Sequence, residues 1–377
     1  MEKLKVLHIF SGYGGGVSAL LLNIVGCSSD TIDHTLLSLC KDNADPYISK
    51  IIGYGGHCIF ANYPKNGGLL LFLRSLNNVF ANGHYDAVHC HIDGWRIIPI
   101  RMIAKRHGIK SFVVHAHKTL QDHPLDRNVF MVNFNRLVNY FFATNYMTCS
   151  QLAANYVFGK FFQRNRVAYL IPNGMNASLF EEKISTDQIE EYRKNFGINV
   201  GELVIGHVGR LNSQKNHSFI FRIVKELILK GVKVKVVIVG DGELKDQLEK
   251  MICEMNLGNH IIMVGRRSDI SLLMQFFDLM LLPSPREGLP TVAVECQAAG
   301  TPMFLSDTIT QQCDMDLGLL RFLPLQVDCW VDSILNEIPT KKDINVCLDR
   351  IKQNGFTAEG AGKIYSNYMC TIIKENR

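Results

Sequence analysis

One short stretch decides the fold, and it reads Pro285-Arg286-Glu287-Gly288-Leu289-Pro290-Thr291-Val292-Ala293-Val294-Glu295. The run before it, residues 278–284, is short and apolar and ends in Pro and Ser, which predicts a buried strand. Pro290 suits the first position of a helix, where a backbone N–H would have no intrahelical acceptor. A buried strand followed directly by a helix indicates an α/β fold.

Two glutamates mark this strand-to-helix connection. Seven residues separate Glu287 from Glu295, so we expect Glu287 on the loop and Glu295 about a turn and a half into the helix. The free N–H groups near Thr291 and Val292 face outward at the helix N-terminus, which suits an anion such as phosphate. Carboxylates accept hydrogen bonds from hydroxyls, so the arrangement predicts a site for a sugar nucleotide.

The whole string also resembles a known signature. Glu-Gly-Leu-Pro-(x)4-Glu, followed by the sequence Ala-Ala-Gly-Thr-Pro at residues 298–302, resembles retaining glycosyltransferases of family 4, above all the bacterial members that assemble polysaccharides. The resemblance implies the α/β GT-B architecture, with two Rossmann-like domains facing across a cleft. It further implies transfer of a sugar, from a UDP-sugar by preference, to a glycan or lipid-linked hydroxyl with retention, in exopolysaccharide or capsule synthesis.

The rest of the chain alternates strand-like and helical segments, which predicts parallel sheets covered by helices on both faces. Expected strands lie near residues 4–10, 34–40, 57–60, 86–90, 111–115, 146–149, 167–171, 203–208, 234–239, 260–264, 279–282 and 303–305. Expected helices lie near 16–26, 67–81, 95–107, 128–143, 181–196, 216–230, 243–256, 269–276 and 290–299.

The domain boundary is expected at a turn rich in Pro, Asn and Gly. The string Ile-Pro-Asn-Gly-Met-Asn, residues 171–176, is typical of such a turn and resembles the hinge of the family. We therefore expect an acceptor domain over residues 1–173 and a nucleotide-sugar domain over 174–356. By resemblance, a last helix within 357–377 returns to the N-terminal domain.

Composition is that of an ordinary globular protein. The 377 residues are 47% hydrophobic and 20% charged, with a net charge of +5. The eleven cysteines include no Cys-x-x-Cys pair, which favours reduced, mostly buried thiols over a disulfide framework or a zinc site. No apolar run reaches about 18 residues, so no membrane span is expected. Residues 68–80 can form an amphipathic helix, for which core packing is the commoner fate.

Positive charges follow another expected strand. Gly209 allows a close backbone approach, and Arg210 and Lys215 follow it within one loop. A leaving nucleoside diphosphate gains negative charge, which fixed cations stabilise as it develops. Solvated surface residues are the alternative, but the neighbouring signature favours phosphate binding for both cations.

By resemblance, further residues belong to the site. The loop amides of Gly14, Gly15 and Gly16 are expected near the donor phosphate, although Val17 breaks a dinucleotide-binding fingerprint and so argues against NAD. Arg267 follows another expected strand, at the end of which family members contact the base through backbone atoms. The transferred sugar is assigned to Glu287 and the ribose hydroxyls to Glu295. Contacts to the donor are expected from the intervening residues Gly288, Leu289, Pro290 and Thr291.

Histidines end two strands of the N-terminal half. His115 and His117 lie on one face of an extended segment, and by resemblance one of them, His117 by preference, lies near the reacting centre. His89 and His91 form a second such pair, but no third convergent ligand can be counted, so we expect no metal site. An Asp-x-Asp sequence at residues 314–316 is read as a solvated loop. No cofactor and no divalent metal are expected, because GT-B enzymes hold the diphosphate with cations and helix dipoles.

Two other classes of protein share this fold. A sugar-nucleotide epimerase or hydrolase would release free sugar without an acceptor, and a non-catalytic nucleotide-sugar-binding protein would not need both glutamates and both cations. The expected partners are the nucleotide sugar and a glycan or lipid-linked oligosaccharide, and no nucleic acid. The expected location is the cytoplasm, with or without peripheral contact at the inner face of the membrane.

Overall fold

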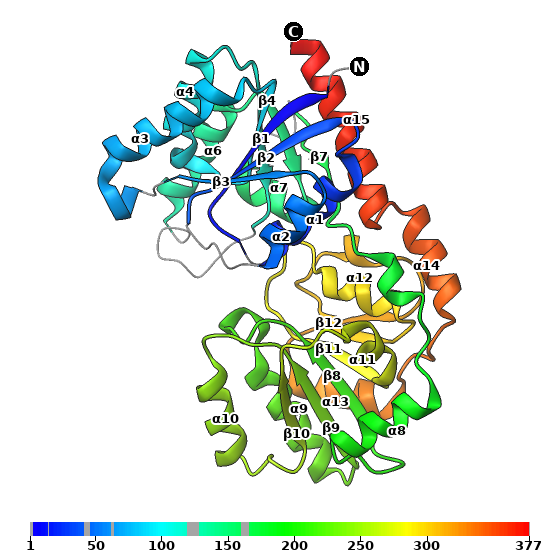
Figure 1. Cartoon of the computed structure of the whole chain (residues 1–377). Coiled ribbons are helices and arrows are strands. Elements are labelled where there is room, and N and C mark those ends of the chain that lie inside the picture. The colour runs from blue at the N-terminus through cyan, green and yellow to red at the C-terminus, as the bar shows by residue number, and fades with distance from the viewer. Residues whose placement is uncertain are drawn as a thin grey trace. The chain divides into compact units, whose positions relative to one another are not determined.

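Two parallel β-sheets organise the chain (Figure 1). The computed structural model describes residues 3–13, 15–40, 46–61, 64–118, 128–159 and 166–376. The chain divides into one unit of Met1–Gly174 with Gly355–Arg377 and a second of Met175–Asn354. The expectation of two Rossmann-like α/β domains is confirmed.

The sheet of the first unit has the order β3-β2-β1-β4-β5-β6-β7, and its described neighbours pair in parallel. Its strands are β1 (Leu4–Phe10), β2 (Ile32–Ser38), β3 (His57–Phe60), β4 (Ala87–Cys90), β5 (Ser111–Ala116), β6 (Asn145–Thr148) and β7 (Tyr169–Leu170). The helices are α1 (Gly15–Ser28), α2 (Pro46–Gly53), α3 (Pro64–Gly83), α4 (Ile97–Arg106), α6 (Val129–Phe142), α7 (Gln151–Val157) and α15 (Ala358–Asn376).

The sheet of the second unit has the order β10-β9-β8-β11-β12-β13, also parallel. Its strands are β8 (Leu203–Val208), β9 (Val234–Val239), β10 (Ile261–Gly265), β11 (Leu279–Leu282), β12 (Met303–Ser306) and β13 (Leu320–Leu323). The helices are α8 (Thr186–Asn195), α9 (His217–Leu229), α10 (Lys245–Glu254), α11 (Ile270–Phe276), α12 (Thr291–Ala298), α13 (Val327–Asn336) and α14 (Ile344–Gln353).

Both sheets reverse their strand order at one place. The reversal lies between β1 and β4 in the first sheet and between β8 and β11 in the second. The connections that leave neighbouring strands at such a point run to opposite faces of the sheet, which opens a crevice at the carboxyl ends. The crevice of each sheet is therefore where its ligand-binding side chains are expected.

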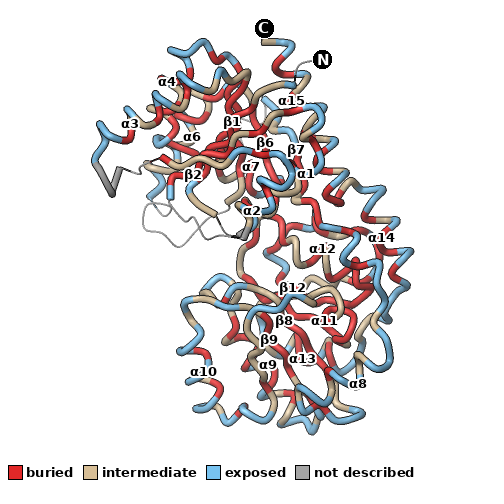
Figure 2. Tube along the Cα trace, viewed as in Figure 1, coloured by how far each residue is buried: buried red, intermediate tan, exposed pale blue. Residues whose placement is uncertain are grey.

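Each unit has its own buried centre (Figure 2). In the second unit, α9 and α13 cover β8 and β9, and Trp330 is buried against Phe219 with ring centroids 5.4 Å apart. In the first unit, α15 contributes Tyr365 and Met369 to the cluster that contains Val6 of β1. Fully burying one large apolar side chain stabilises a fold by about 1.5–3 kcal/mol, so α15 is part of the core of this unit.

The approach of α15 to the first unit depends on glycine. A Cβ at Gly362 would lie 2.4 Å from the Cβ of Cys27 in α1, and a Cβ at Gly174 would lie 2.6 Å from the carbonyl oxygen of Thr357. The carbonyl of Gly174 also accepts a hydrogen bond from the Asn23 amide. The chain therefore leaves the first unit and returns to it at one closely packed place.

Several local expectations differ from the structure. Pro290 is the N-cap of α12, which begins at Thr291, because Pro290 is extended (ψ 103°) and its carbonyl accepts the Ala293 N–H at 3.0 Å. The expectation that most cysteines are buried is wrong: all eleven are free, but only five are buried. Cys253, for example, is exposed although it belongs to α10.

Apart from the last helix, α15, the elements beyond residue 310 were not expected from the sequence. β13 pairs only with β12 among the described strands and is partly buried along its length, so its apolar pattern is weak. In the preceding Asp-x-Asp stretch, Met315 is buried and Asp316 is exposed and accepts a 3.1 Å hydrogen bond from Arg350. Within the described part of the chain, no helix is long and apolar enough to cross a bilayer.

Candidate active site

A lysine and a glutamate meet where the second sheet reverses its strand order. The Lys215 Nζ lies 2.7 Å from Glu287 Oε1, and both side chains are largely buried. The Gln214 amide donates to Glu287 Oε2 at 3.1 Å and to the carbonyl of Arg286 at 3.0 Å. Both carboxylate oxygens of Glu287 are therefore held by residues of the loop that follows β8.

That loop has a conformation fixed by two asparagines. The Asn212 side chain accepts the Lys215 N–H at 3.3 Å and caps a short 3₁₀ turn, Ser213–Lys215. Asn216 then adopts a left-handed conformation (φ 53°) and donates its side-chain amide to the carbonyl of Pro283 at 3.1 Å. Asn tolerates this conformation better than most residues, so the turn directs Lys215 towards the end of β11.

Glycines let the loops after β8 and β9 touch backbone to backbone. Gly209 donates its N–H to the carbonyl of Val239 at 3.0 Å, and a Cβ at Gly240 would lie 1.9 Å from the Gly209 oxygen. Gly240 also has φ 145°, and a Cβ at Gly242 would lie 2.5 Å from the Leu211 oxygen. No other residue type fits Gly240 without backbone movement. The Lys215 stem lies directly beside Gly209, where a Cβ would meet it at 3.0 Å.

The start of α12 adds backbone donors. Gly288, Leu289 and Pro290 connect Glu287 to the helix, and the Leu289 side chain is buried. The first N–H groups of a helix have no intrahelical acceptor, and the helix dipole places a partial positive charge there. With Thr291 as its first residue, this helix end carries the chemistry needed to bind an anion.

Glu295 lies one turn inside α12 and is partly buried. Burial raises the pKa of its carboxyl group to about 7, and the positive charge of Lys215 acts in the opposite direction. Within the part of the chain that the structure describes, no side chain forms a hydrogen bond or ion pair with this carboxylate. Glu295 is therefore a carboxyl group free to bind hydroxyls beside the Lys215–Glu287 pair.

The two predicted arginines have different surroundings. Arg210 is exposed, and its guanidinium makes no hydrogen bond or ion pair with the described residues. Arg267 instead forms a bidentate pair with Asp269, at 2.9 and 2.7 Å, and Tyr192 donates to the same carboxylate at 2.6 Å. These bonds hold the pKa of Asp269 below its usual range. The side chain of Arg267 is thus engaged in linking α8 to the end of β10, and it forms no hydrogen bond or ion pair with Glu287 in the described structure.

Two buried histidines and a serine of this region were not singled out from the sequence. His207 of β8 donates its Nδ1–H to the Leu281 carbonyl, 2.8 Å away, and its ring packs edge-on against His217, 4.7 Å between centroids. Burial lowers the pKa of His217 to about 4, with a further contribution from Lys215. The hydroxyl of Ser284, directly after β11, is buried without a partner in the described structure. His207 stands inside an apolar strand, His217 begins α9 and Ser284 follows β11, and none of these positions carried a functional signal in the sequence.

The predicted residues of the first unit are spread over two strand ends. Gly15 begins α1, and a Cβ added at Gly16 would have no neighbouring atom within 4 Å. Gly14 lies outside the described residues. His115 is inside β5 and almost fully buried, whereas His117 follows the strand and is only partly buried. Their rings stack 4.0 Å apart, as the alternation of the strand predicts.

Four further histidines join these two in one array. His8 of β1 is hydrogen-bonded to His34 of β2 at 3.0 Å, His89 to His115 at 3.0 Å, and His91 to His117 at 2.7 Å. Burial lowers the pKa of every ring in the array, to about 3 for His34 and His117, so all six are neutral at pH 7. The contribution of β1 and β2 was missed because their histidines stand inside apolar runs.

The match to a family model lies in the second unit. Residues 188–315, which include Lys215, Glu287 and Glu295, match the family described as "Glycosyl transferases group 1". The chain is also 31% identical over 340 residues to the Bacillus subtilis (strain 168) protein named "Putative glycosyltransferase EpsF", with 88% of this chain and 86% of that protein covered. The chain belongs to the glycosyltransferases of group 1.

Further similarities place this glycosyltransferase among proteins of known fold. It is 30% identical over 217 residues, 55% of each chain, to the Escherichia coli UDP-Gal:alpha-D-GlcNAc-diphosphoundecaprenol alpha-1,3-galactosyltransferase. The crystal structure of Anabaena HepE in complex with UDP superposes with a TM-score of 0.70 at 19% identity, over 99% of this chain and 98% of that chain. The GT-B class of fold is therefore confirmed for this glycosyltransferase.

Proposed function

We propose that this glycosyltransferase moves a sugar from a UDP-sugar to a hydroxyl of a glycan or lipid-linked acceptor in the synthesis of a bacterial surface polysaccharide. The anomeric configuration is retained, and the diphosphate is bound without a divalent metal. The observation that carries the proposal is the Lys215–Glu287 pair, 2.7 Å apart at the strand reversal of the second sheet and adjacent in sequence to the start of α12.

The opposite charges of this pair suit the two parts of a nucleotide sugar, the cation for the diphosphate and the carboxylate for the hydroxyls. The Lys215 ammonium group and the N-terminus of α12 supply positive potential for the diphosphate. Their electrostatic attraction for the leaving group becomes stronger as negative charge develops on it. Arg210 adds a guanidinium group that forms no hydrogen bond or ion pair with the described residues. This group can bind two phosphate oxygens at once. These groups perform the work that a divalent cation performs in other phosphate sites, which supports the absence of a metal from the donor site.

The two glutamates divide the hydroxyls of the donor between them. We assign Glu287, oriented at both oxygens by Lys215 and Gln214, to the hydroxyls of the transferred sugar. Glu295, with no partner among the described side chains, is assigned to the ribose hydroxyls. A carboxylate accepts two hydrogen bonds from a vicinal diol, and this acceptor is strongest when the group is ionised, above its pKa of about 7.

The preference for UDP and for a lipid-linked acceptor is supported by named relatives. The Escherichia coli relative is named for transfer from UDP-galactose to a diphosphoundecaprenol-linked sugar. The structurally similar HepE was crystallised with UDP and also with UDP-glucose. We infer the same donor class and acceptor class for this chain.

Retention is proposed to proceed without a covalent intermediate. The departing phosphate oxygen accepts the proton of the acceptor hydroxyl, and the new glycosidic bond forms on the face that the phosphate leaves. Lys215 and Arg210 stabilise the charge on the departing diphosphate in that step. Glu287 is not assigned as a nucleophile, because both of its oxygens are already hydrogen-bonded. Trapping of a covalent glycosyl-enzyme in the Glu287→Gln variant would contradict a mechanism without a covalent intermediate.

His117 is proposed to act at the reacting centre. It lies beyond the end of β5 and is only partly buried, whereas His115 is inside the strand and hydrogen-bonded to His89. This difference favours His117 over His115. We expect His117→Asn to lower kcat while leaving the dissociation constant for UDP unchanged, as measured by steady-state kinetics and calorimetry.

A peripheral membrane contact is proposed for the first unit. α4 packs against α3 and α6, and these three helices expose apolar side chains beside the basic last turn of α4. The exposed side chains are Leu69, Leu70, Leu71, Met102, Val129, Phe130, Phe134, Leu137 and Phe141. Apolar groups beside Lys and Arg suit an anionic membrane surface. Flotation with anionic vesicles tests this: Phe130→Ser should lose binding, and Val200→Ser, on the other unit, should retain it.

The donor assignment is tested by binding before chemistry. Thermal shift and calorimetry with UDP, GDP, ADP and their sugar conjugates, in EDTA and again with magnesium, should show stabilisation by UDP and UDP-sugars that EDTA does not change. Lys215→Ala and Arg210→Ala should abolish it, whereas Lys225→Ala, an exposed lysine of α9, should not.

Three results would contradict the proposal. Absence of stabilisation by any nucleotide would remove the site assignment, and stabilisation only with magnesium would overturn metal independence. If free sugar is released from the donor at the same rate with and without acceptor, a hydrolase or epimerase is favoured over a transferase.

A further inference from the structure

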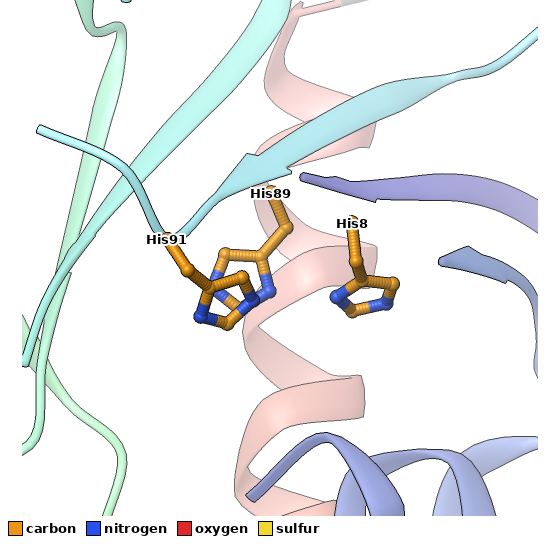
Figure 3. Close-up of side chains that lie close together, drawn as sticks. All are labelled: His8, His89 and His91. Atoms are coloured by element: carbon orange, nitrogen blue, oxygen red, sulfur yellow. The ribbon is translucent and has the colours of Figure 1, made fainter. Parts of the chain in front are cut away.

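Three histidines converge at the strand reversal of the first sheet (Figure 3). His8 of β1 and His89 of β4 are register partners on adjacent parallel strands, and His91 follows β4. One ring nitrogen of each lies within 4.8 Å of the corresponding nitrogens of the other two. Because these positions lie on different strands, the cluster is a product of strand pairing.

Each of the three rings carries one nitrogen with a partner and one without. The partnered nitrogens are Nε2 of His8, Nε2 of His89 and Nδ1 of His91, and each is hydrogen-bonded to another imidazole. The remaining nitrogens, His8 Nδ1, His89 Nδ1 and His91 Nε2, are buried and have no hydrogen-bond partner in the described structure. Buried nitrogens are rarely left in this state, so three in one cluster indicate a missing ligand.

The proton positions behind His8 follow from a chain of hydrogen bonds. The Ser28 hydroxyl donates to the Ile24 carbonyl at 2.6 Å, so its oxygen must accept from His34 Nε2, 2.9 Å away. His34 is neutral, so its Nδ1 carries a lone pair and accepts from His8 Nε2 at 3.0 Å. His8 therefore points the lone pair of Nδ1, not a proton, into the cluster.

His89 and His91 can present lone pairs in the same way. If Nε2 of His89 donates to His115, its Nδ1 is an acceptor, and if Nδ1 of His91 donates to His117, its Nε2 is an acceptor. In this arrangement, all three ligands donate their second N–H to a neighbouring imidazole. Metal-bound histidines are oriented by a hydrogen-bond acceptor at the other nitrogen, which here is His34, His115 or His117.

We propose that His8, His89 and His91 form a binding site for a late first-row divalent cation, with Zn²⁺ as its physiological occupant. Three neutral imidazoles suit zinc, copper, nickel and cobalt, whereas Mg²⁺ and Ca²⁺ require oxygen ligands. Zinc–nitrogen bonds of about 2.0–2.1 Å in a tetrahedron place the ligand nitrogens about 3.3 Å apart. Each nitrogen then moves inward by about 0.8 Å or less from the present spacing, which a small ring rotation supplies.

Three protein ligands leave a fourth coordination position for water, hydroxide or another anion. An anionic fourth ligand would reduce the charge of the ion in this buried place. The ring of Tyr365, from α15, stacks on His89 with centroids 5.3 Å apart, and its hydroxyl is likewise buried without a partner in the described part of the chain. An aromatic ring therefore packs against one of the three ligands. The proposal is independent of the donor site, which lies on the other unit.

A second set of three, His91, His115 and His117, also has nitrogens within 4.8 Å. It shares His91 with the first set, so the two sets cannot each hold an ion through the same nitrogen. His91 and His117 are also hydrogen-bonded to each other. His89 Nε2 and His115 Nδ1 share one hydrogen bond, so only one of these two nitrogens carries a proton. If each ring has a single proton, the ring that accepts this bond must carry its own proton on the other nitrogen. His89 Nδ1 and His115 Nε2 therefore cannot both present a lone pair. Only the first set contains His8, whose Nδ1 lone pair is fixed by its hydrogen bond to His34, so we assign the ion to the first set.

Metal binding itself tests the proposal. Tag-free full-length protein, stripped with EDTA, is titrated with Zn²⁺ against a chromogenic chelator, and Co²⁺ is added separately to record its visible spectrum. We expect the wild type to bind one equivalent more than His8→Asn, and Co²⁺ to give the intense bands of a four-coordinate site. Asn keeps a hydrogen-bonding group but is a poor zinc ligand. The matched control His107→Asn changes an exposed histidine and should bind as the wild type does.

Supporting variants separate ligands from their neighbours. Ser28→Ala removes the acceptor of His34, and His115→Asn replaces the partner of His89, so each should weaken Zn²⁺ binding by about 10- to 100-fold without abolishing it. Equal stoichiometry in the wild type and His8→Asn would overturn the proposal, as would loss in His115→Asn with retention in His8→Asn. If His8→Asn does not fold, the wild type decides alone: no tightly bound Zn²⁺, or Co²⁺ with only weak six-coordinate bands, rejects the site.

Discussion

Replacing Glu295 by Gln should stabilise the unliganded protein and at the same time weaken its binding of the donor. Burial raises the pKa of the Glu295 carboxyl group from 4.5 to about 7 in the folded chain. A carboxyl group whose pKa is raised on folding contributes stability that is fully present below its unfolded pKa and is lost as pH rises through its folded pKa. The wild type should therefore lose stability between about pH 4.5 and pH 7, and the amide should not.

The size of the effect follows from the two pKa values. Each pKa unit corresponds to about 1.4 kcal/mol, so the full difference is about 3 kcal/mol. Glu295 is partly exposed, and solvent reduces the effect, so we expect about 1–3 kcal/mol above pH 8. The difference in unfolding free energy between Glu295→Gln and the wild type should be near zero at pH 4.5 and reach this value at pH 8.

Urea unfolding followed by tryptophan fluorescence measures this difference on the correct unit. Trp330 is fully buried in the second unit, whereas Trp95 is half exposed, so the signal change comes mainly from Trp330. The control Glu243→Gln makes the same chemical change at an exposed position of the same unit. A stabilisation that is constant with pH, or that grows as pH falls, would refute the reasoning. Calorimetry with UDP should show weaker binding by Glu295→Gln at pH 8.

Other expected outcomes concern the donor loop, the glycine contact and the histidine array. Lys215→Ala should lower kcat by about 100- to 1000-fold, because it removes a cation from the leaving group and leaves Glu287 without its partner; unchanged kcat would exclude that role. Gly240→Ala should destabilise the second unit by at least about 3 kcal/mol in urea unfolding, since its Cβ meets the Gly209 oxygen at 1.9 Å. Gly231→Ala, with a positive φ but open space, should cost only about 1 kcal/mol. The first unit should lose stability as pH falls from about 6.5 towards 3, because its neutral buried histidines become charged only on unfolding; near-ultraviolet circular dichroism that is unchanged across this range would contradict it.

Much of the fold was predictable because its signals are local. Apolar strands such as β8 and β11 are fully or largely buried, so each reads as a short apolar run. Glycines at Gly209 and Gly240 mark strand ends where backbones meet, and both lie where the sequence placed loops. The positions after strand ends gather at one edge of a parallel sheet, so Lys215 and Glu287 could be expected near one another.

The partners of these residues were not predictable. Gln214, which holds the second oxygen of Glu287, is an ordinary loop residue until the loop is folded. The side chain of Arg267 is engaged by Asp269 two residues further on, a pairing that was not expected from the sequence. The raised pKa of Glu295 depends on what covers α12, which the helix sequence does not contain.

By itself, the sequence determined the α/β class, the order of most strands along the chain, and the loops that carry the donor-site candidates, because these depend on patterns a few residues long. Only the tertiary structure decided which strands lie side by side. The pairing of β1 with β4 places His8 opposite His89, 81 positions apart in the chain, and the pairing of β1 with β2 places His34 behind them. Strand order is set by how helices pack on both faces of the sheet, and no local pattern encodes it.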